Sequence, residues 1–378
     1  MTKKIRVGMI GGGPGAFIGA IHRRAMWLDN RFEIVAGAFS RDAEKSRQMA
    51  AELGVDADRA HTSADKLMEA EKLLPVEDRI QCISVVTPNA YHYEACALAV
   101  ENGFHIVCDK PPTRTLEETI ALKELLAGSP SLYALTFTYL GYPMVHEARS
   151  RVLNGDIGKI RKVFVQYPQG WLSTPLEKEE VKQASWRTDP ALSGPAGCLG
   201  DIGTHAFSLA EFISGKKVNS VCADIRSFVD GRLVDDDVSV LMGMSDDVSG
   251  VLLASQIMAG EENALTIKVY GETGGFQWSH SDPNTLIHMD LNGPTQILRA
   301  GQDNGYLSAQ TQQLLRTPSG HPEGFIEAFS NIYGQMADAI VGNGELGEGV
   351  GIEAGERVMR FVDAVLTNAI SSEKWTEM

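Results

Sequence analysis

A lysine followed by two prolines is one of three places in the chain where residue type and spacing are suited to chemistry. Lys110 follows an expected strand at residues 105–108 and precedes Pro111 and Pro112. Proline restricts the residue before it to extended conformations, so Lys110 is held out of helical geometry. An ammonium group shielded from water has a lowered pKa and can exchange a proton near neutral pH. A solvated surface charge is the alternative, but the strand end and the double proline favour a functional lysine.

Asp201 and His205 form the second place, in a glycine-rich segment that leads into an expected helix. Residues four apart share one face of a helix, so both side chains would face the same ligand. Histidine is suited to take a hydroxyl proton while the carbon beside it loses hydride. Asp201 could orient a substrate hydroxyl or His205; alternatively, Asp201 is an N-cap and His205 a core residue. A zinc site is not predicted, because no third cysteine or histidine ligand is evident.

The third place is a glycine loop between an expected strand at residues 5–10 and the next helix. Strand, glycine turn and helix are the context of a dinucleotide fingerprint, in which backbone N–H groups face a pyrophosphate. The third position of the fingerprint is a small residue at which the helix packs closely on the strand. The usual spacing places Ala16 there, but Gly19 fits this position if the loop carries a two-residue insertion. A merely flexible loop is the alternative. The residues expected to contact the dinucleotide are Gly11, Gly13, Pro14, Gly15, Ala16, Phe17 and Ile18.

The end of the second expected strand, residues 32–39, bears on the choice of cofactor. An acidic residue at this point binds the ribose 2′-hydroxyl of NAD. Here Ser40 and Arg41 follow the strand, Glu33 comes too early, and Asp42 is already the helix start. Ser40 and Arg41 could accept a 2′-phosphate, which slightly favours NADP over NAD; alternatively, Arg41 is a solvated surface charge.

The elements that must position these residues change in kind near residue 141. Before it, apolar strands alternate with helices, which predicts a parallel sheet covered on both faces. Ser40 or Asp42, Ser63 and Thr115 are the expected N-caps, and Gly54 ends one helix. After it, strands follow one another and predict a mostly antiparallel sheet with one open face. The expected strands are 161–167, 221–229, 238–244, 250–258, 266–270 and 286–291, and two helices, 325–340 and 353–370, end the chain.

Composition limits the classes of function. The 378 residues suit two domains, and the formal net charge of −15 argues against nucleic acid as a partner. Five cysteines without CxxC spacing predict neither a disulfide framework nor a zinc site. No apolar run reaches the length of a membrane span, and the beginning of the chain lacks a secretory pattern. We therefore expect a cytoplasmic globular protein that does not bind a membrane.

In combination, these motifs resemble the Gfo/Idh/MocA oxidoreductase family over nearly the whole chain. The likeness includes the glycine loop, Thr87-Pro88-Asn89 with His92, the Lys110-Pro111 turn, Asp201-x-Gly203-x-His205 and Tyr270-Gly271-Glu272-x-Gly274. The resemblance implies a Rossmann domain, assigned to residues 1–141, and an α/β substrate and oligomerisation domain, assigned to residues 142–378. It also implies that Lys110, Asp201 and His205 are catalytic. The remaining expected cofactor-binding residues are Thr87, Pro88, Asn89, His92, Asp109 and Lys110.

The chain departs from the family pattern at several positions, and the last two named here concern the substrate side in relatives. Asp109 replaces the usual glutamate, Leu140 stands where many members have arginine, and Ser208 replaces a frequent aspartate. Substrate identity is therefore not transferable. Residues 167–187 are the expected substrate-loop region, in which aromatic rings could stack on a sugar or form a lid or subunit contact. The expected substrate-binding residues are Lys110, Gln169, Trp171, Trp186, Arg187, Asp201 and His205.

The function predicted from these residues is hydride transfer between NAD or NADP and a secondary alcohol of a sugar, inositol or related polyol. His205 would take the hydroxyl proton, Lys110 would stabilise alkoxide charge, and Asp201 would position a hydroxyl or the histidine. One alternative keeps the cofactor tightly bound for transient oxidation during glycoside cleavage or epimerisation. A non-catalytic nicotinamide sensor is another. The open sheet face predicts a homodimer or homotetramer.

Overall fold

The computed structural model describes residues 3–179 and 181–378. Their contacts divide the chain into two compact units, made of residues 1–136 with 329–356 and of residues 137–328 with 357–378. The sequence-based boundary between residues 141 and 142 differs from this division, because the chain returns to the first unit near its C-terminal end. Each unit is described by itself.

The first unit is built on a five-stranded parallel sheet with the order β2-β1-β3-β4-β5. Its strands are β1 (Ile5–Gly11), β2 (Phe32–Ala38), β3 (Cys82–Val86), β4 (His105–Cys108) and β5 (Tyr133–Leu135). All five residues of β3 are buried, as expected of a central strand whose two faces are both covered. The carboxyl ends of these strands carry the glycine loop, Thr87 and the Lys110 turn.

The helices of this sheet begin and end where local signals predict. Asp42 accepts the Lys45 N–H, Ser63 the Lys66 N–H and Thr115 the Glu118 N–H. These bonds confirm the Ser63 and Thr115 caps and select Asp42 over Ser40 for the third helix. Gly54 ends its helix in the left-handed conformation at φ 70°. The helices are α1 (Phe17–Leu28), α2 (Ala43–Leu53), α3 (Ala64–Lys72), α4 (His92–Glu101) and α5 (Leu116–Ala127).

The later helix α11 (Phe325–Ile340) supplies residues 329–340 to the first unit. Its Tyr333 is buried, and its ring lies edge-on to Phe32 and to His22. Apolar contact with β2 and α1 therefore explains why a segment so late in the sequence packs with the first unit.

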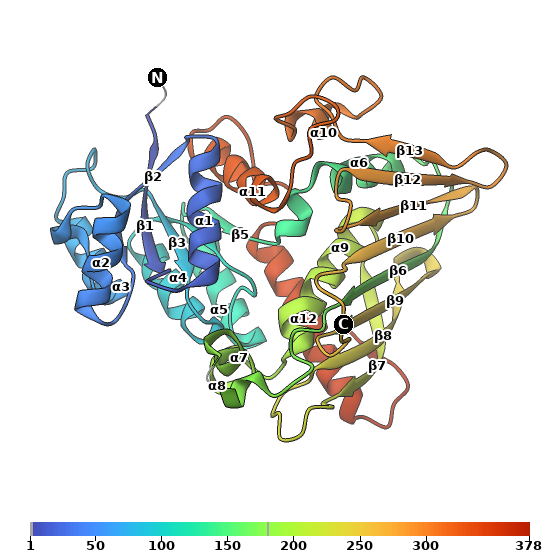
Figure 1. The fold of residues 1–378 in the computed structure, drawn as a ribbon, viewed down its shortest axis with the longest axis horizontal. Coiled ribbons are helices and arrows are strands. Elements are labelled where there is room, and N and C mark those ends of the chain that lie inside the picture. The colour runs from blue at the N-terminus through green and yellow to red at the C-terminus, as the bar shows by residue number, and fades with distance from the viewer. Residues whose placement is uncertain (1–2, 180) are drawn as a thin grey trace. The chain divides into compact units, whose positions relative to one another are not determined.

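The second unit contains a nine-stranded sheet with the order β13-β12-β11-β10-β6-β9-β8-β7-β14, fanned out in Figure 1. Among the described strand pairs of this sheet, only β6–β9 is parallel, so the mostly antiparallel prediction is confirmed. The strands are β6 (Ile160–Pro168), β7 (Val218–Arg226), β8 (Asp237–Met244), β9 (Val248–Ser255), β10 (Thr266–Gly271), β11 (Gly274–Ser279), β12 (Thr285–Asp290), β13 (Gln296–Arg299) and β14 (Thr376–Glu377).

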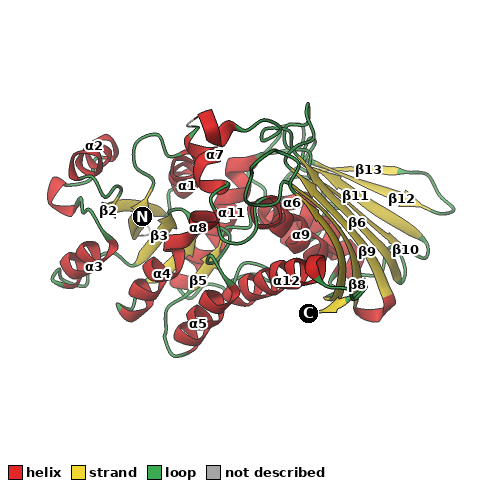
Figure 2. Cartoon of the chain, turned by 90° about the horizontal axis from the view of Figure 1, so that it is seen from below, coloured by secondary structure: helices red, strands yellow, loops and turns green. Residues whose placement is uncertain are grey.

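One face of this sheet is covered by helices, as Figure 2 shows. They are α6 (Pro143–Leu153), α9 (Thr204–Ser214) and the part of α12 (Ile352–Ile370) that belongs to this unit. Phe207 of α9 stacks on Phe361 of α12, with ring centroids 4.3 Å apart. Burial alternates along β8, so that Val238, Val240 and Met242 face the core and Leu241 faces outward.

Three short strands and three short helices were not expected from the sequence. They are β11, β13 and β14, with α7 (Lys182–Arg187), α8 (Pro190–Ser193) and α10 (Ala309–Gln313). Gly274 and Gly275 weaken the strand pattern of β11, and the short elements offer too few residues for a period. After β5, residues 138–141 form a 3-10 turn. Within the described residues, no helix is both long and apolar enough to cross a membrane.

Candidate active site

The glycine loop after β1 adopts conformations that require glycine. Gly11, Gly12 and Gly15 have φ values of 88°, 72° and 74°. A Cβ on Gly13 would lie 2.6 Å from the Phe39 carbonyl oxygen. A Cβ on Gly19 would lie 2.5 Å from the Cα of Gly12, so Gly19 is the residue that lets α1 pack on the loop, as the insertion hypothesis predicts.

The start of α1 is suited to an anion. Ala16 offers no capping side chain, and the first turn of Phe17–Leu28 contains no acidic residue. Apart from Gly15 and its two chain neighbours, no described residue has a heavy atom within 4 Å of the position that a Cβ on Gly15 would take. The exposed N–H groups of a helix start carry partial positive charge. The loop and helix start can therefore receive a pyrophosphate from the solvent side.

Thr87 lies beside this loop, since its Cγ2 is 3.0 Å from the position of a Cβ on Gly11. Its hydroxyl oxygen is buried and has no hydrogen-bond partner within residues 3–179 and 181–378. A buried hydroxyl without a partner costs about 1–3 kcal/mol, so a ligand that bonds it would relieve that cost. Together with the open space at Gly15, this residue fits a dinucleotide cofactor.

Ser40 and Arg41 follow β2, where the ribose of the adenosine half would bind. The Arg41 guanidinium carbon lies 5.1 Å from the centre of the Tyr91 ring, and its side chain is exposed. The Ser40 hydroxyl accepts the Asp42 N–H at 3.2 Å. Hydrogen bonding to the Lys45 N–H holds the pKa of Asp42 below its ordinary value, so this carboxylate is engaged as a helix cap. Because the Asp42 carboxylate caps the helix and neither Ser40 nor Arg41 is acidic, these three residues offer no free carboxylate to the ribose 2′-hydroxyl.

Lys110 lies at the carboxyl end of β4, followed by a cis peptide bond to Pro111. The neighbouring Asp109 side chain is 14% exposed and points to the interior. It accepts the Thr136 hydroxyl at 3.1 Å and lies 3.6 Å from His22 Nε2. Burial raises its pKa, but hydrogen bonding to His22 and the charges of His22, Lys110 and His92 together outweigh burial and lower the pKa of Asp109 to about 2. Asp109 is therefore an ionised support of the Lys110 turn.

A buried polar chain continues from Asp109 into α11. His22 Nδ1 lies 2.8 Å from the Tyr333 hydroxyl, and that hydroxyl lies 3.1 Å from the Ser84 hydroxyl on β3. The sequence analysis did not identify Tyr333 or His22, because nothing in local spacing relates residues 311 positions apart. These buried contacts support the Lys110 turn on the side that faces the protein interior.

His92, the first residue of α4, is fully buried. Its Nδ1 lies 2.8 Å from the Pro111 carbonyl oxygen and its Nε2 lies 2.9 Å from the Thr87 carbonyl oxygen. Both ring nitrogens are therefore engaged with the backbone. The His92 and Asp109 side chains, both expected to bind the cofactor, point into the protein and lie beside the loops that carry Thr87 and Lys110.

In the second unit, Asp201 lies in a wide helical turn, Leu199–Gly203, that leads directly into α9. Such π-type turns are frequent at functional sites. The start of this segment is held by Asp235, whose carboxylate accepts the Gly197 N–H at 2.6 Å and the Leu199 N–H at 2.7 Å. Burial raises the pKa of Asp235 to about 6. Because Asp235 performs the capping, the N-cap alternative for Asp201 does not hold.

The Asp201 carboxylate is joined to two side chains from other elements. It accepts a hydrogen bond from Gln256 Nε2 at 2.9 Å and lies 3.3 Å from Arg187 Nε. Its side chain is 18% exposed, so part of it can still meet a ligand. This ion pair brings Arg187, from the expected substrate-loop region, to Asp201.

His205 is surrounded by aromatic rings and is 7% exposed. The ring centroids of Tyr139, Phe137 and Tyr167 lie 4.9, 5.6 and 6.3 Å from its own. These rings fix the orientation of the imidazole, since a packed side chain has few accessible rotamers. The core-residue alternative therefore describes the packing of His205 well, although it does not account for the polar groups nearby.

Those polar groups form a cluster that the sequence analysis missed, apart from Gln169. Asn263 Oδ1 accepts hydrogen bonds from Gln169 Nε2 at 2.7 Å and from the Tyr167 hydroxyl at 2.5 Å. The Asn263 amide donates to the Tyr139 hydroxyl at 2.9 Å. Asn263 precedes β10, and no motif marks it. Only the alignment of antiparallel strands brings it beside Gln169.

Trp171 and Trp186 both contact Arg187. The Arg187 guanidinium carbon lies 4.3 Å from the Trp186 ring and 6.0 Å from the Trp171 ring. These are distances at which a cation is attracted to an aromatic face. One face of the Trp186 ring is therefore occupied by Arg187, which changes the expected stacking of this ring on a sugar.

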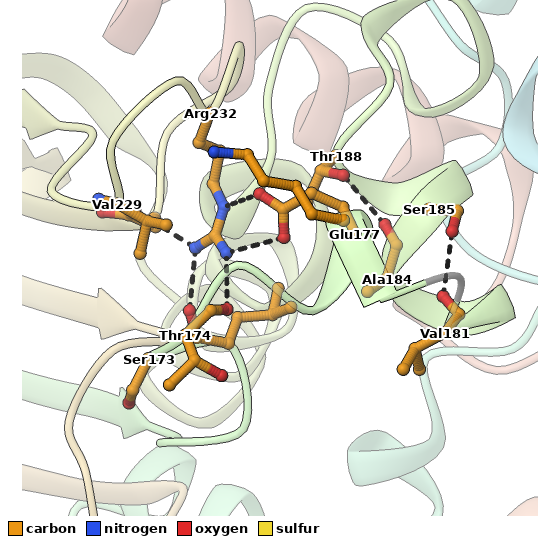
Figure 3. Close-up of polar contacts among 12 residues, drawn as sticks. Ser173, Thr174, Glu177, Val181, Ala184, Ser185, Thr188, Val229 and Arg232 are labelled. Carbon is orange, nitrogen blue, oxygen red and sulfur yellow. Dashed lines mark hydrogen bonds and ion pairs between the residues drawn. The ribbon is translucent and has the colours of Figure 1, made fainter.

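The loop that carries Trp171 is held by Arg232, a buried side chain that precedes β8 (Figure 3). Arg232 makes two hydrogen bonds to the Glu177 carboxylate, at 3.1 and 3.0 Å, and donates to the carbonyls of Leu172 and Thr174. Its charge is also matched by Asp236 at 3.2 Å. The loop is thus anchored to the segment whose Asp235 caps the Asp201 turn.

Comparison with known proteins gives two family matches. Residues 5–137 match an oxidoreductase family with an NAD-binding Rossmann fold, and residues 145–277 match the GFO/IDH/MocA C-terminal domain. An uncharacterized oxidoreductase, YfiI, of Bacillus subtilis is 32% identical over 100% of this chain and 98% of its own. The chain belongs to the Gfo/Idh/MocA oxidoreductase family.

Two further Gfo/Idh/MocA relatives have named substrates or ligands. An inositol dehydrogenase homolog from Azotobacter vinelandii, solved with NAD+, has a TM-score of 0.94 and 33% identity over 100% of this chain and 98% of its own. A structure of that homolog also holds NADH and myo-inositol. Levoglucosan dehydrogenase of Pseudarthrobacter phenanthrenivorans is 28% identical over 75% of this chain and 76% of its own. The chain is therefore an oxidoreductase with sugar and inositol dehydrogenase relatives.

Proposed function

We propose that this protein is an NAD(P)-dependent dehydrogenase of a secondary alcohol in a sugar, an inositol or a related polyol. The observation that carries the proposal is the network around Asp201, in which Arg187, Gln256 and Gln169 meet one helical turn before His205. Such a set of charged and amide groups can hold several neighbouring hydroxyls, which is what a polyol presents. The inositol-bound and levoglucosan-oxidising relatives support this substrate class.

Each proposed catalytic residue has one role. His205 takes the proton of the reacting hydroxyl, and Lys110 donates a hydrogen bond that stabilises negative charge on the same oxygen. Asp201 accepts a hydrogen bond from a neighbouring hydroxyl while Gln256 and Arg187 hold it in place. When bound, the nicotinamide accepts the hydride from the carbon. Gly11, Gly13, Gly15 and Thr87 would hold the dinucleotide in the first unit.

For the cofactor, we propose that NADP is accepted with a slight preference over NAD. The support is the exposed Arg41, whose guanidinium lies over Tyr91, while the adjacent Asp42 carboxylate is engaged as a helix cap. A guanidinium binds a phosphate through charge-assisted hydrogen bonds. Relatives solved with NAD+ or NADH make NAD the natural comparison in every assay.

We also propose that the open face of the nine-stranded sheet pairs with a second copy of the chain. Phe164, Leu241 and Ile297 on this face are 36%, 46% and 60% exposed. The strand registers align Phe164 and Leu241 with Val251, so these side chains form one apolar area. A large exposed apolar area indicates an interface, and two copies of the same face would cover each other.

The test of the function is a screen of cofactor reduction with NAD and with NADP across sugars, inositols and glycosides. We expect reduced nicotinamide to accumulate with a polyol that carries a free secondary alcohol. Cleaved or inverted products without net reduction would replace the proposal by transient oxidation with a retained cofactor. Dinucleotide binding without turnover on any substrate would indicate a sensor.

A further inference from the structure

His92 has an environment that determines its protonation state. The ring is fully buried at the start of α4. Both of its nitrogens lie at hydrogen-bond distance from backbone carbonyl oxygens, that of Pro111 at 2.8 Å and that of Thr87 at 2.9 Å. A carbonyl oxygen can only accept a hydrogen bond. Each ring nitrogen must therefore carry a proton for both contacts to be hydrogen bonds.

A neutral imidazole has one N–H group, whereas an imidazolium has two. In the neutral form, one nitrogen lone pair would face a carbonyl lone pair inside the protein, which is unfavourable in a medium of low dielectric constant. The charged form satisfies both carbonyls, but it places a cation away from water. A buried cation requires a nearby negative charge.

Asp109 supplies that charge. Asp109 is the next residue after Cys108, whose side chain contacts His92. The Asp109 carboxylate is ionised at neutral pH because its pKa lies at about 2. Burial by itself lowers the pKa of an imidazole, but the Cys108 side chain, the Asp109 carboxylate and the Pro111 carbonyl raise the pKa of His92 to about 9. Among the described residues, Cys108 and Asp109 of the β4 end are the titratable groups that act on His92.

His146 provides the contrast within the same chain. It is also buried, and its Nε2 lies 2.7 Å from the Leu140 carbonyl oxygen. Its Nδ1 has no partner within the described chain. One tautomer of a neutral ring satisfies this site, and burial lowers the pKa of His146 to about 4. The protonation states of the two buried histidines therefore differ because His92 faces two carbonyl acceptors and His146 faces one.

We propose that His92 is a positioning residue that acts as a buried imidazolium, cross-linking the two loops of the dinucleotide site through the carbonyls of Thr87 and Pro111. One bond holds the loop that carries the Thr87 hydroxyl, and the other holds the turn that carries Lys110. The His92 cation and the Asp109 carboxylate attract each other, and this attraction stabilises the Lys110-Pro111 turn. This inference rests on dinucleotide binding by the family fold and not on the substrate class.

The first test is nitrogen NMR of the wild-type protein labelled with 15N-histidine. Near neutral pH, we expect both His92 nitrogens to be protonated, while His146 in the same spectrum shows one protonated and one bare nitrogen. The His92 signals are assigned by their loss in His92→Gln, or in His92→Asn if the first variant does not fold. A neutral His92 tautomer near neutral pH would overturn the inference.

The second test is the dissociation constant of NADP and of NAD, measured by quenching of protein fluorescence. The side-chain amide introduced by His92→Gln can donate to one carbonyl but carries no charge, so we expect affinity for both dinucleotides to fall about tenfold, the effect of losing a hydrogen bond from a charged group. The matched control is His105→Asn, at the opposite end of β4, where the ring nitrogen only accepts the Leu132 N–H. Unchanged affinity in His92→Gln, or an equal loss in His105→Asn, would contradict the positioning role.

Discussion

The carboxylate of Asp235 accepts the backbone N–H of Leu199 at 2.7 Å, and so a residue just before β8 holds the start of the helix that carries His205. The next residue, Asp236, faces Arg232, which anchors the loop of Trp171. Two adjacent aspartates thus support the two parts of the second unit to which substrate contacts are assigned. Each support can be tested separately.

Asp235 makes a prediction about pH. Its folded-state pKa of about 6 lies above its ordinary value of 3.8. The Asp235 side chain therefore stabilises the fold at pH values below 3.8, and this contribution is lost as the pH rises through about 6. We expect the Tm of the wild type to decrease across this interval more than that of Asp235→Asn, which cannot titrate. Thermal unfolding in a pH series measures this difference.

The control for that series is Asp246→Asn. Asp246 is exposed, and its hydrogen bond and ion pair with Lys216 lower its pKa. Its contribution is therefore present above the ordinary value of 3.8 and lost at lower pH. We expect the Asp246→Asn curve to parallel the wild type between about pH 4 and about pH 6. Parallel wild-type and Asp235→Asn curves would contradict the assignment.

Replacing Lys110 tests the proposed alkoxide stabilisation. Lys110→Met removes the ammonium and keeps a chain of similar length, so we expect kcat to fall about 10²–10³-fold, with dinucleotide affinity nearly unchanged. Steady-state kinetics and fluorescence titration measure the two quantities. The exposed Lys66→Met on α3 serves as the control. Near-normal turnover in Lys110→Met would refute this role for the lysine.

Arg41 should distinguish the two dinucleotides. Arg41→Ala removes the cation at the end of β2, so we expect the Kd of NADP to rise about tenfold, because a charge-assisted hydrogen bond to phosphate is lost. The Kd of NAD should change little. The exposed Arg47→Ala on α2 is the matched control. An equal change for both dinucleotides would exclude a contact with the 2′-phosphate.

Arg232 should matter for stability and for substrate affinity together. Arg232→Met leaves Asp236 buried without its cation, and breaking a buried ion pair costs about 3–5 kcal/mol. We expect a higher KM for the polyol, since the Trp171 loop loses its anchor, with dinucleotide affinity unchanged. Glu177→Gln, which keeps the cation, is a milder variant should the first not fold.

The control for the loop anchor is Arg226→Met, an exposed arginine paired with Asp224 at 2.9 Å. Denaturant unfolding and initial-rate kinetics on all three variants separate stability from KM. If neither Arg232→Met nor Glu177→Gln changes KM, the loop does not depend on this anchor for substrate binding.

The open sheet face predicts the behaviour of the protein in solution. Leu241→Lys places a charge in the apolar area shared with Phe164 and Val251. We expect light scattering to show a smaller assembly than the wild type, with unfolding of the monomer unaffected because Leu241 faces outward. The exposed Leu73→Lys on the first unit is the control. A wild-type chain that is monomeric at high concentration would end the proposal.

Much of the first unit could be predicted from the sequence because its signals are local. Asp42, Ser63 and Thr115 mark helix starts within three residues of the N–H groups they accept. The glycine loop is equally local, since Gly11 and Gly15 require positive φ wherever they lie. The order of the elements, strands alternating with helices or strands in succession, then distinguished the parallel from the antiparallel sheet.

The polar groups that support the site could not be predicted, because they come from distant parts of the chain. Asn263 joins Gln169 across 94 positions, and Tyr333 joins His22 across 311. Residue type also did not reveal which way a side chain points. His92 and Asp109 point inward, although both adjoin the loops that carry Thr87 and Lys110. Only packing decides which face of a strand end is open.

The sequence by itself determined the strand–glycine–helix turn, the Lys110-Pro111-Pro112 segment and the spacing of Asp201 and His205, since each depends on neighbours along the chain. The tertiary structure decided that Asp235 caps the helix start, that Arg187 pairs with Asp201, and that His92 faces two carbonyls. Hydrogen bonds and ion pairs act over a few ångströms of space, and the distance along the chain does not specify that separation.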